Sequence, residues 1–415
     1  MTASPGSKSL PPVIVQKYGG TSVATPERIR HVAQRVLDTQ RSGHSVVVVV
    51  SAMSGVTDSL IKLADQVSQT PTHREMDVLL ATGEQTTIAL TAMAINALGG
   101  KAVSLTGAQA GIITNGSHTS AKIANLSPRQ IRKHLSDGLI CIVAGFQGQT
   151  LHGRITTLGR GGSDLTAIAI AAALKAKNCE ICTDVDGVYT CDPRIVPTAR
   201  KIDEITYEEM LEMASSGSKV MQSRSVEFAK KFNVPFEVRS SFNTNRGTIV
   251  KEETPGLENV VLRGVSVERN QAKVTIPKVP DTPGAASRIF TALAEAGVVV
   301  DVIVQNASSS GTTDISFTLN RDELEKIGHT LDSVVKEIGA APLVRKDGIA
   351  KLSVVGIGMR SHSGVAARLF EALGQGGINI QMISTSEIKI AVIIDEDKIV
   401  EAANLAHEAF GLANA

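Results

Sequence analysis

One short motif near the start of the chain has the composition of a phosphate-binding turn. Residues 17–22 read KYGGTS and follow an apolar run that is predicted to be a strand. Glycines let the backbone approach a ligand closely, backbone N–H groups there can surround phosphate oxygens, and Lys17 would add a positive charge. The alternative is a tight strand-to-helix turn with an exposed lysine, and the local chemistry alone favours neither interpretation.

A second glycine-rich block could bind an anion. Residues 156–164 read TTLGRGGSD and precede an Ala-rich stretch that is predicted to be a helix. The guanidinium of Arg160 matches a carboxylate or phosphate in two-point contact, and a helix N-terminus offers free N–H donors. We expect Ser163 or Asp164 to cap that helix. A plain glycine-rich turn is the alternative, but an arginine among glycines favours the anion site.

A third polar block follows another predicted strand. Residues 183–194 read TDVDGVYTCDPR, and loops at the ends of strands in an α/β sheet are where ligands bind. An ordinary polar loop is the alternative. Glu84 lies within a long apolar helical pattern, where a glutamate is either exposed or buried with a partner, and its residue type alone favours exposure. Lys219 could be only a solvated lysine.

Several well-known patterns are absent or incomplete. The Walker sequence does not occur, and the G-x-G-x-x-G pattern that begins at Gly159 has Asp164 in place of its third glycine. Cys179 and Cys182 form a lone C-x-x-C, whose members would point to opposite faces of a strand. Without a second pair or a nearby histidine, structural packing explains these cysteines better than zinc binding does.

The composition is that of an ordinary soluble protein with two or three domains. The 415 residues are 42% hydrophobic and 20% charged, with a formal net charge of +1. No basic run interleaves with aromatic residues, so nothing indicates a nucleic-acid partner. Residues 1–12 lack the apolar core of a secretory signal, and no membrane span or disulfide framework is expected. We therefore expect a cytoplasmic protein.

The first 240 residues alternate between short apolar runs and longer helical patterns, which predicts an α/β domain with a largely parallel sheet covered by helices on both faces. The expected strands are residues 13–16, 46–50, 139–144, 180–183, 236–240 and 247–250. The expected helices are residues 26–39, with Thr25 as N-cap, 76–98, 165–177 and 208–231.

The last third of the chain contains an internal repeat. The run GAASRIF at 284–290 recurs as GVAARLF at 364–370, and residues 297–306 recur at 377–386. Each copy is predicted to form a strand, a helix opened by glycine, two strands and a helix, which is the order of a ferredoxin-like unit. A duplication without any ligand remains an alternative. The predicted organisation is a catalytic domain at 12–250, a linker at 251–264, and repeat domains at 265–342 and 343–415.

The three blocks, GSKV at 217–220 and the duplicated tail together resemble bacterial monofunctional aspartokinases with tandem ACT domains, over residues 13–410. The resemblance implies an amino-acid kinase fold followed by two ACT domains. It implies transfer of the ATP γ-phosphate, with Mg²⁺, to the β-carboxylate of L-aspartate. The product would be 4-phospho-L-aspartate, in the first step of lysine, threonine and methionine biosynthesis.

The resemblance also implies roles for individual residues. Lys17, Asp164 and Arg160 would be catalytic, Glu84 would pair with the substrate ammonium group and Arg160 with its α-carboxylate, and Asp164 would organise the site or its Mg²⁺. The implied nucleotide-binding residues are Lys17, Tyr18, Gly19, Gly20, Ser163, Thr183, Asp184, Tyr189, Asp192, Arg194 and Lys219. The implied aspartate-binding residues are Ser51, Thr57, Glu84, Arg160, Gly161, Gly162 and Ser163.

The tail would bind lysine, threonine or both as feedback effectors. The implied effector residues are Asp281, Gly284, Ala285, Gln305, Asn306, Val365, Asn379, Ile380, Thr385, Ser386 and Glu387. ACT domains pair across subunits, which implies a homo-oligomer or a complex with a shorter regulatory subunit. Residues 222–358 contain no Met, so a shorter subunit made from an internal start would need a non-Met start codon.

Two other functions compete with this interpretation. The first is a kinase of the same fold that acts on N-acetylglutamate, glutamate or UMP, against which the KYGGTS block and the tandem tail both argue. The second is a non-catalytic amino-acid sensor, against which the presence of Lys17, Glu84, Arg160 and Asp164 argues. The length and the missing dinucleotide fingerprint argue against a fused dehydrogenase.

Overall fold

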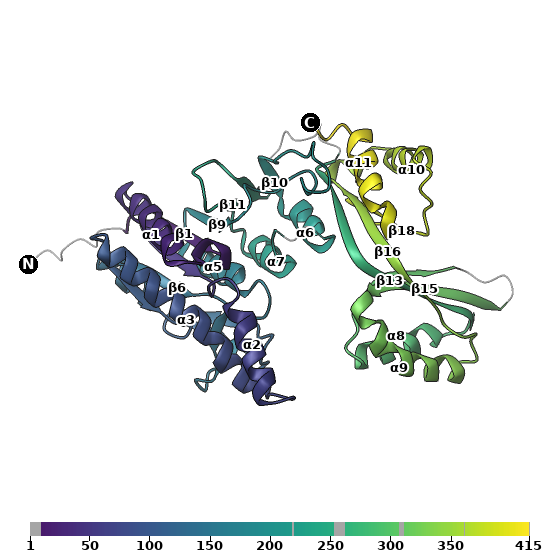
Figure 1. The fold of residues 1–415 in the computed structure, drawn as a ribbon, viewed down its shortest axis with the longest axis horizontal. Helices are drawn as coiled ribbons and strands as arrows, with labels where there is room; N and C mark the ends of the chain where they lie inside the picture. Colours follow the sequence, from purple (N-terminus) through teal and green to yellow (C-terminus); the bar gives the residue numbers. More distant parts are fainter. Residues whose placement is uncertain (1–9, 218–219, 253–261, 307–310, 361, 415) are drawn as a thin grey trace, which may run out of the picture. The chain divides into compact units, whose positions relative to one another are not determined.

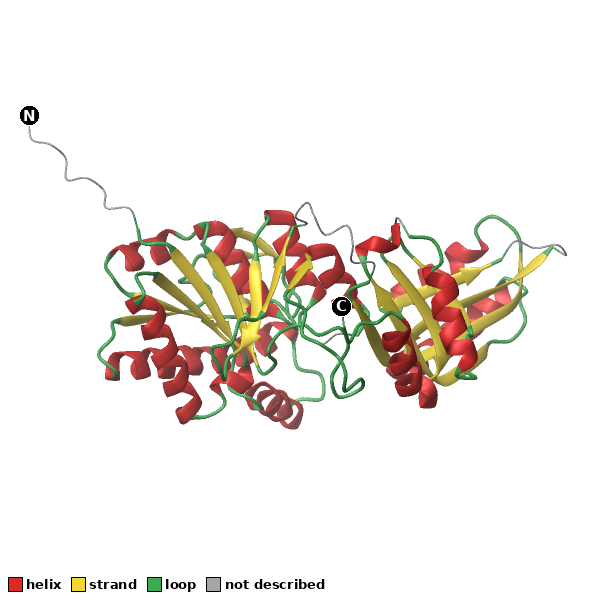
Figure 2. Cartoon of the chain, turned by 90° about the horizontal axis from the view of Figure 1, so that it is seen from above, coloured by secondary structure: helices red, strands yellow, loops and turns green. Residues whose placement is uncertain are grey.

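A computed structural model describes residues 10–217, 220–252, 262–306, 311–360 and 362–414. The chain divides into two compact units, which are drawn in Figures 1 and 2. The N-terminal unit comprises residues 1–188, 201–214 and 219–254, and the C-terminal unit comprises residues 189–200, 215–218 and 255–415.

The N-terminal unit is built on an eight-stranded sheet in the order β10-β12-β11-β9-β1-β2-β6-β3. Its strand pairs are parallel except β11 with β12, as the alternating pattern predicts. All six residues of β2 are buried, because helices cover both faces of the sheet. The strands are β1 (Val13–Tyr18), β2 (Ser45–Val50), β3 (Ala102–Leu105), β6 (Ile140–Ala144), β9 (Asn178–Thr183), β10 (Glu204–Thr206), β11 (Phe236–Ser240) and β12 (Thr248–Lys251).

Helices α1 and α3 share a hydrophobic core with Tyr18 and the alternate residues of β2 and β6, whereas α5 packs against β1 and β9. Because side chains alternate along a strand, Lys17 and Tyr18 of β1 point to opposite faces. The helices of this unit are α1 (Pro26–Arg41), α2 (Val56–Val67), α3 (His73–Ala97), α4 (Arg129–Ser136), α5 (Gly162–Leu174), α6 (Tyr207–Ser215) and α7 (Ser223–Phe232).

A smaller four-stranded sheet, in the order β5-β4-β7-β8, also belongs to this unit. Its strands are β4 (Ile112–Thr114), β5 (Ile123–Leu126), β7 (Gln147–Gln149) and β8 (Ile155–Thr157). Strand β8 contains the first two residues of the TTLGRGGSD block, so this sheet positions the block ahead of α5.

Two of the helix predictions are wrong in detail. Helix α5 begins at Gly162, and its N-cap is Gly161 in the left-handed region at φ 69°, without any side-chain cap. Ser163 and Asp164 therefore lie inside the first turn rather than capping it. The single helix expected at 208–231 is two helices, α6 and α7, because Gly217 between them adopts φ 110°, which ends a right-handed helix. The N-cap prediction for α1 is confirmed, since Thr25 Oγ1 accepts the Arg28 N–H at 3.3 Å.

Helix α3 has the length and apolar composition of a membrane span, although no membrane span is expected from the sequence. Half of its most apolar stretch is nevertheless buried inside the structure, and Asp77 and Glu84 are buried along it. That pattern is typical of a core helix.

The C-terminal unit contains a six-stranded sheet in the order β14-β15-β13-β16-β18-β17. The repeat prediction is confirmed, because each copy has the order strand, helix, strand, strand, helix. The first copy is β13 (Gly264–Pro280), α8 (Ala285–Glu295), β14 (Val300–Gln305), β15 (Thr312–Asn320) and α9 (Leu324–Glu337). The second is β16 (Val344–Val355), α10 (Val365–Gln375), β17 (Met382–Thr385), β18 (Lys389–Asp395) and α11 (Ile399–Ala409). The long strands β13 and β16 pair with each other and join the copies (Figure 1).

The TDVDGVYTCDPR block is divided between the two units after Val188. Its second half packs into the core of the C-terminal unit, where Cys191 and Val196 are buried with residues of β16, α10 and α11. Thr190 Oγ1 lies 2.9 Å from His407 Nε2, and both residues are buried. The block therefore connects the two units covalently through one polar motif.

Candidate active site

The carboxyl ends of six neighbouring parallel strands, β11, β9, β1, β2, β6 and β3, meet at one edge of the larger sheet. Tyr18 at the end of β1 is in register with Val50 of β2 and Cys182 of β9, and Thr183 of β9 is in register with Ser240 of β11. The KYGGTS turn and residues 183–188 therefore leave the sheet side by side. This edge is where ligands bind in open α/β sheets.

The lysine of the KYGGTS turn pairs with the acidic residue of the TTLGRGGSD block. Lys17 Nζ lies 2.6 Å from Asp164 Oδ1, and the two residues are 9% and 7% exposed. Asp164 lies in the first turn of α5, where the helix dipole favours negative charge. This pair places one cation and one helix N-terminus together at the sheet edge, the combination that a phosphate group requires.

Small residues let the surrounding segments approach this pair. A Cβ atom on Gly20 would lie 3.0 Å from the Ala52 carbonyl oxygen, and one on Gly145 would lie 2.5 Å from Ser163 Oγ. The turn after β1 is therefore in close contact with the segment after β2, and the residue after β6 is in close contact with the start of α5. Tyr18 is fully buried on the α1 and α3 face, so only its backbone could face a ligand at the edge.

Glu84 is buried, so the expectation of an exposed glutamate is wrong. It is 4% exposed, and its Oε1 accepts the Ala52 N–H at 3.0 Å, while its Oε2 is buried and has no hydrogen-bond partner among the residues that the structure describes. Burial raises the pKa of Glu84 to about 7, although the hydrogen bond from Ala52 lowers it. Gly83 makes the approach to Ala52 feasible, since a Cβ there would lie 2.8 Å from the Ala52 Cβ. A buried carboxylate with one free oxygen is suited to a cationic ligand group.

The other residues implied for aspartate binding are more exposed. Ser51 follows β2 directly and is half-buried, and Thr57 is half-buried at the start of α2. Arg160 is exposed, and in the part of the chain that the structure describes its guanidinium has no ion-pair partner. Position 161 requires glycine. Its backbone is left-handed, and the Cβ atom of any other residue would lie 2.0 Å from the side chain of Gln222.

The sequence reasoning missed a second buried carboxylate on α3. Asp77 is fully buried two helical turns before Glu84, and its carboxylate accepts hydrogen bonds from Thr157 Oγ1 at 2.6 Å and from the Thr119 N–H at 3.0 Å. Its Oδ2 also lies 2.5 Å from His118 Nδ1. Asp77 thus holds the start of the block that carries Arg160. Its seven-residue spacing from Glu84, which places both residues on one face of a helix, is the signal that could have identified it.

The implied nucleotide residues fall into three groups. Thr183 and Asp184 lie at the sheet edge, where Thr183 Oγ1 donates to Asp184 Oδ1 at 3.1 Å. Tyr189, Asp192 and Arg194 belong to the C-terminal unit, and Arg194 lowers the pKa of Asp192 through a hydrogen-bonded ion pair at 2.7 Å. Lys219 lies outside the described residues.

The implied effector residues lie at matching positions of the two repeats. Gly284 precedes α8 at φ 98° and Gly364 precedes α10 at φ 92°, so Ala285 and Val365 both begin their helices. Most of these residues are exposed, namely Asp281, Gly284, Gln305, Asn306, Asn379, Thr385, Ser386 and Glu387, whereas Ala285 and Ile380 are half-buried and Val365 is buried. Their roles stay predictions.

The structure contains no preformed carboxylate cage for a metal ion, because no group of three or more His, Cys, Asp and Glu side chains forms within the described residues. The four cysteines are free and buried, and burial raises the pKa of Cys182 to about 12. A divalent cation at the sheet edge would thus have Asp164 beside it and would need further oxygen ligands from elsewhere.

Comparison with protein families matches both units. The amino acid kinase family matches residues 12–240, and the ACT domain matches residues 277–331 and 352–410. The chain is 52% identical to an aspartate kinase of Pseudomonas putida over 96% of this chain and 98% of that protein. It is 53% identical to an aspartokinase of Geobacillus stearothermophilus over 97% of this chain and 98% of that protein.

Solved structures agree with these relatives. Aspartokinase III of E. coli in complex with aspartate and ADP matches with a TM-score of 0.79 and 26% identity, over 96% of this chain and 99% of that one. The aspartate kinase of Synechocystis matches with a TM-score of 0.54 and 43% identity, over 97% of this chain and 70% of that one.

Proposed function

The chain belongs to the aspartokinases of the amino acid kinase family, with ACT domains in its tail, and we propose that it transfers the γ-phosphate of ATP to the β-carboxylate of L-aspartate. The product would be 4-phospho-L-aspartate, the first intermediate on the route to lysine, threonine and methionine. The aspartate and ADP found in the E. coli structure support this choice of substrates.

One observation carries the proposal. The ion pair between Lys17 and Asp164 lies at the N-terminus of α5, and Ala52 connects the same sheet edge to Glu84, whose second oxygen is free. The edge therefore offers a positive site for a polyphosphate and a negative site for an ammonium group. A substrate that must bring a carboxylate to a phosphate and that also carries an ammonium group fits both.

The proposed chemistry needs positioning more than acid–base catalysis. A carboxylate is already a nucleophile at neutral pH, so no strong base has to activate it. Lys17 and the first N–H groups of α5 would stabilise charge on the transferring phosphoryl group. Glu84 would hold the ammonium group of aspartate and Arg160 its α-carboxylate, which leaves the β-carboxylate as the reacting end.

Mg²⁺ fits this donor set. Mg²⁺ in kinases is held by one or two carboxylates together with the phosphates of the nucleotide, and Asp164 is the buried carboxylate beside Lys17. The ion would neutralise phosphate charge that otherwise repels the incoming carboxylate. The nucleotide itself would contact the backbone of Tyr18, Gly19 and Gly20, then Ser163, Thr183 and Asp184. Tyr189, Asp192, Arg194 and Lys219 remain proposed nucleotide ligands as well.

We further propose that lysine, threonine or both inhibit the enzyme through the ACT repeats. E. coli aspartokinase III, at 26% identity and a TM-score of 0.76, was solved with lysine and aspartate bound. The exposed residues at equivalent positions of both repeats, such as Gln305 at the end of β14 and Thr385 at the end of β17, are the proposed contacts. A homo-oligomer through ACT pairing, or a complex with a shorter regulatory subunit, and a cytoplasmic location are part of the same proposal.

The test is ATP- and Mg²⁺-dependent formation of aspartyl hydroxamate from L-aspartate, with lysine, threonine and their mixture added in parallel. Turnover that either amino acid suppresses supports both parts of the proposal. Turnover with glutamate, N-acetylglutamate or UMP in place of aspartate would retain the fold and reject the substrate. No turnover with any acceptor would favour a non-catalytic amino-acid sensor.

A further inference from the structure

The loop that follows β11 joins the two motifs expected to hold the nucleotide. Residues 241–247, here called the β11–β12 loop, leave the same sheet edge as the KYGGTS turn and the end of β9. Ser22 Oγ donates to Ser241 Oγ at 2.8 Å, and both residues are buried. The Ser241 N–H donates to the Thr183 carbonyl oxygen at 2.8 Å. Ser241 therefore contacts both motifs at once.

A second contact of the same loop extends this connection. Asn243 Nδ2 donates to Asp186 Oδ1 at 2.7 Å, two residues beyond Asp184. The backbone after β9 is thus held by the β11–β12 loop at Thr183 and again at Asp186. The separation between the KYGGTS turn and this backbone depends on where the loop lies.

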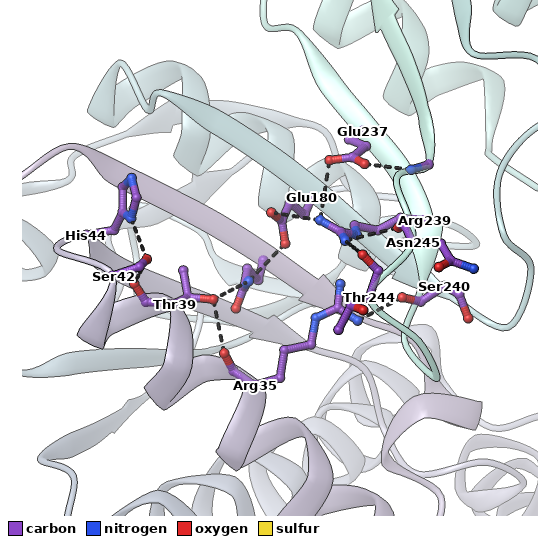
Figure 3. Close-up of polar contacts among 12 residues, drawn as sticks. Arg35, Thr39, Ser42, His44, Glu180, Glu237, Arg239, Ser240, Thr244 and Asn245 are labelled. Atoms are coloured by element: carbon purple, nitrogen blue, oxygen red, sulfur yellow. Dashed lines mark hydrogen bonds and ion pairs between the residues drawn. The ribbon is translucent and has the colours of Figure 1, made fainter.

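Arg35 fixes the loop from helix α1. Its Nη1 donates to the Ser240 carbonyl oxygen at 2.8 Å (Figure 3). The same Nη1 donates to the Asn243 carbonyl oxygen at 2.9 Å. Helix α1 directly follows the KYGGTS turn, so Arg35 closes a ring of contacts from the turn through α1 to the loop and back through Ser22. Two partly buried carbonyl groups would lose this donor without the Arg35 side chain.

The far half of the loop is held separately by β11. Arg239 Nη2 donates to the carbonyl oxygens of Thr244 and Asn245 at 3.0 and 3.1 Å, and the guanidinium lies near Glu180 and Glu237 (Figure 3). Two arginines on different elements therefore hold seven residues that form no regular structure. A plain hairpin connection between antiparallel strands does not require such anchoring.

We propose that Arg35 and Ser241 are positioning residues for the nucleoside triphosphate. They set the distance between the KYGGTS turn, which would bind the phosphates, and residues 183–186, which include the proposed nucleotide ligands Thr183 and Asp184. Neither positioning residue contacts Glu84 and Arg160, which are proposed to bind the substrate aspartate, or the Lys17–Asp164 pair. The inference rests on the proposed function for the identity of the nucleotide. The positioning of the two motifs by the loop concerns nucleotide binding alone.

The first test compares Arg35→Gln with Arg41→Gln, an exposed arginine on the same helix whose ion pair with Asp38 is 3.2 Å long. We expect Arg35→Gln to raise the KM for ATP about tenfold while the KM for aspartate changes less than about twofold, because misplacement affects one substrate only. Arg35→Lys should recover part of the loss, and Arg41→Gln should match the wild type. Equal increases in both KM values, or an unchanged KM for ATP, would overturn the proposal.

The second test does not depend on turnover or on Arg35. The dissociation constant of ADP is measured by calorimetry for wild type, Ser22→Ala, Ser241→Ala and the double variant. We expect both single variants to weaken ADP binding and the double variant to be no weaker than either, because they remove one shared hydrogen bond. Additive losses, or unaltered ADP binding, would reject the inference.

The two tests separate the inference from the proposed function. ADP binding that the variants weaken, in a protein that does not phosphorylate aspartate, would keep the inference and reject the function. Normal aspartate phosphorylation with ADP binding that no variant alters would keep the function and reject the inference.

Discussion

The two candidate binding regions of this molecule differ in how deeply their residues are buried and in how many contacts those residues make with one another. At the edge of the larger sheet, Lys17, Glu84 and Asp164 are each less than 10% exposed, and they are connected through an ion pair and backbone hydrogen bonds. In the ACT repeats the proposed effector residues Gln305 and Ser386 are exposed. The first region is preorganised, whereas the second presents side chains to a ligand or to another subunit.

This difference has an energetic meaning. Buried charges must be paired, so a change in the first region should affect stability and chemistry together. Exposed polar residues contribute little to folding, so a change in the second should affect ligand response alone. The predictions below test that contrast, beginning with the largest expected effect.

Replacement of Lys17 should have the largest effect. We expect Lys17→Ala to lower turnover by about 10³-fold or more, because it removes the cation that we propose to face the transferring phosphoryl group. The variant should also lose about 3 kcal/mol of stability, since Asp164 is left buried and unpaired. Hydroxamate formation and urea unfolding measure the two effects.

The double variant Lys17→Ala/Asp164→Ala provides the control. It should regain part of the stability, because no unpaired charge remains, without regaining activity. Activity near the wild-type rate in either variant would remove Lys17 from the mechanism.

Glu84→Gln should raise the KM for aspartate by about 10²-fold, because the ammonium group loses its buried counter-charge. The equivalent change at the exposed Glu75 on the same helix should have little effect. An unaltered aspartate dependence would reject the ammonium-pairing role of Glu84.

The same substitution should change how stability depends on pH. The pKa of Glu84 is raised from 4.5 to about 7, so between these values the folded state retains a proton that the unfolded state has lost, and stability falls as pH rises. Glu84→Gln removes this fall. The melting temperature of Glu84→Gln minus that of the wild type should therefore be larger at pH 8 than at pH 4.5. A larger difference at pH 4.5 would contradict a carboxylate whose burial disfavours its charged form.

Thr157→Val should have an intermediate effect. It removes the 2.6 Å hydrogen bond to Asp77, which holds the block that carries Arg160, so we expect the KM for aspartate to rise about five- to tenfold with a smaller change in that for ATP. Thr86→Val, at an exposed threonine of α3, is the matched control. Equal effects of the two substitutions would show that Asp77 does not position the block.

Gln305→Ala and Ser386→Phe should have the smallest effect on the enzyme without effectors. Both side chains are exposed, so stability should change by less than about 0.5 kcal/mol. The concentration of lysine or threonine needed for half inhibition should rise more than tenfold, since the contact is lost or blocked. Inhibition curves that match the wild type would place the effector elsewhere.

Much of the fold was predictable from local patterns. The run of valines in β2, the Thr25 cap with Pro26, and the duplicated GAASRIF and GVAARLF runs each indicate their element without knowledge of the neighbours. The start of α5 was not predictable, because a left-handed glycine replaced the expected side-chain cap. The break at Gly217 was missed although residues 215–218 read SSGS, a turn signal, because helix-forming stretches flank it on both sides.

The candidate site also combines features that local sequence patterns predict with features that only packing decides. The sequence by itself determined which residue types could bind phosphate, carboxylate and ammonium groups, because those motifs are local and their chemistry depends on spacing. Only the tertiary structure decided that Glu84 is buried with a free oxygen and that Asp77 and Arg35 hold separate loops. Burial and contacts between residues far apart in sequence depend on how the elements pack, and no local pattern records that packing.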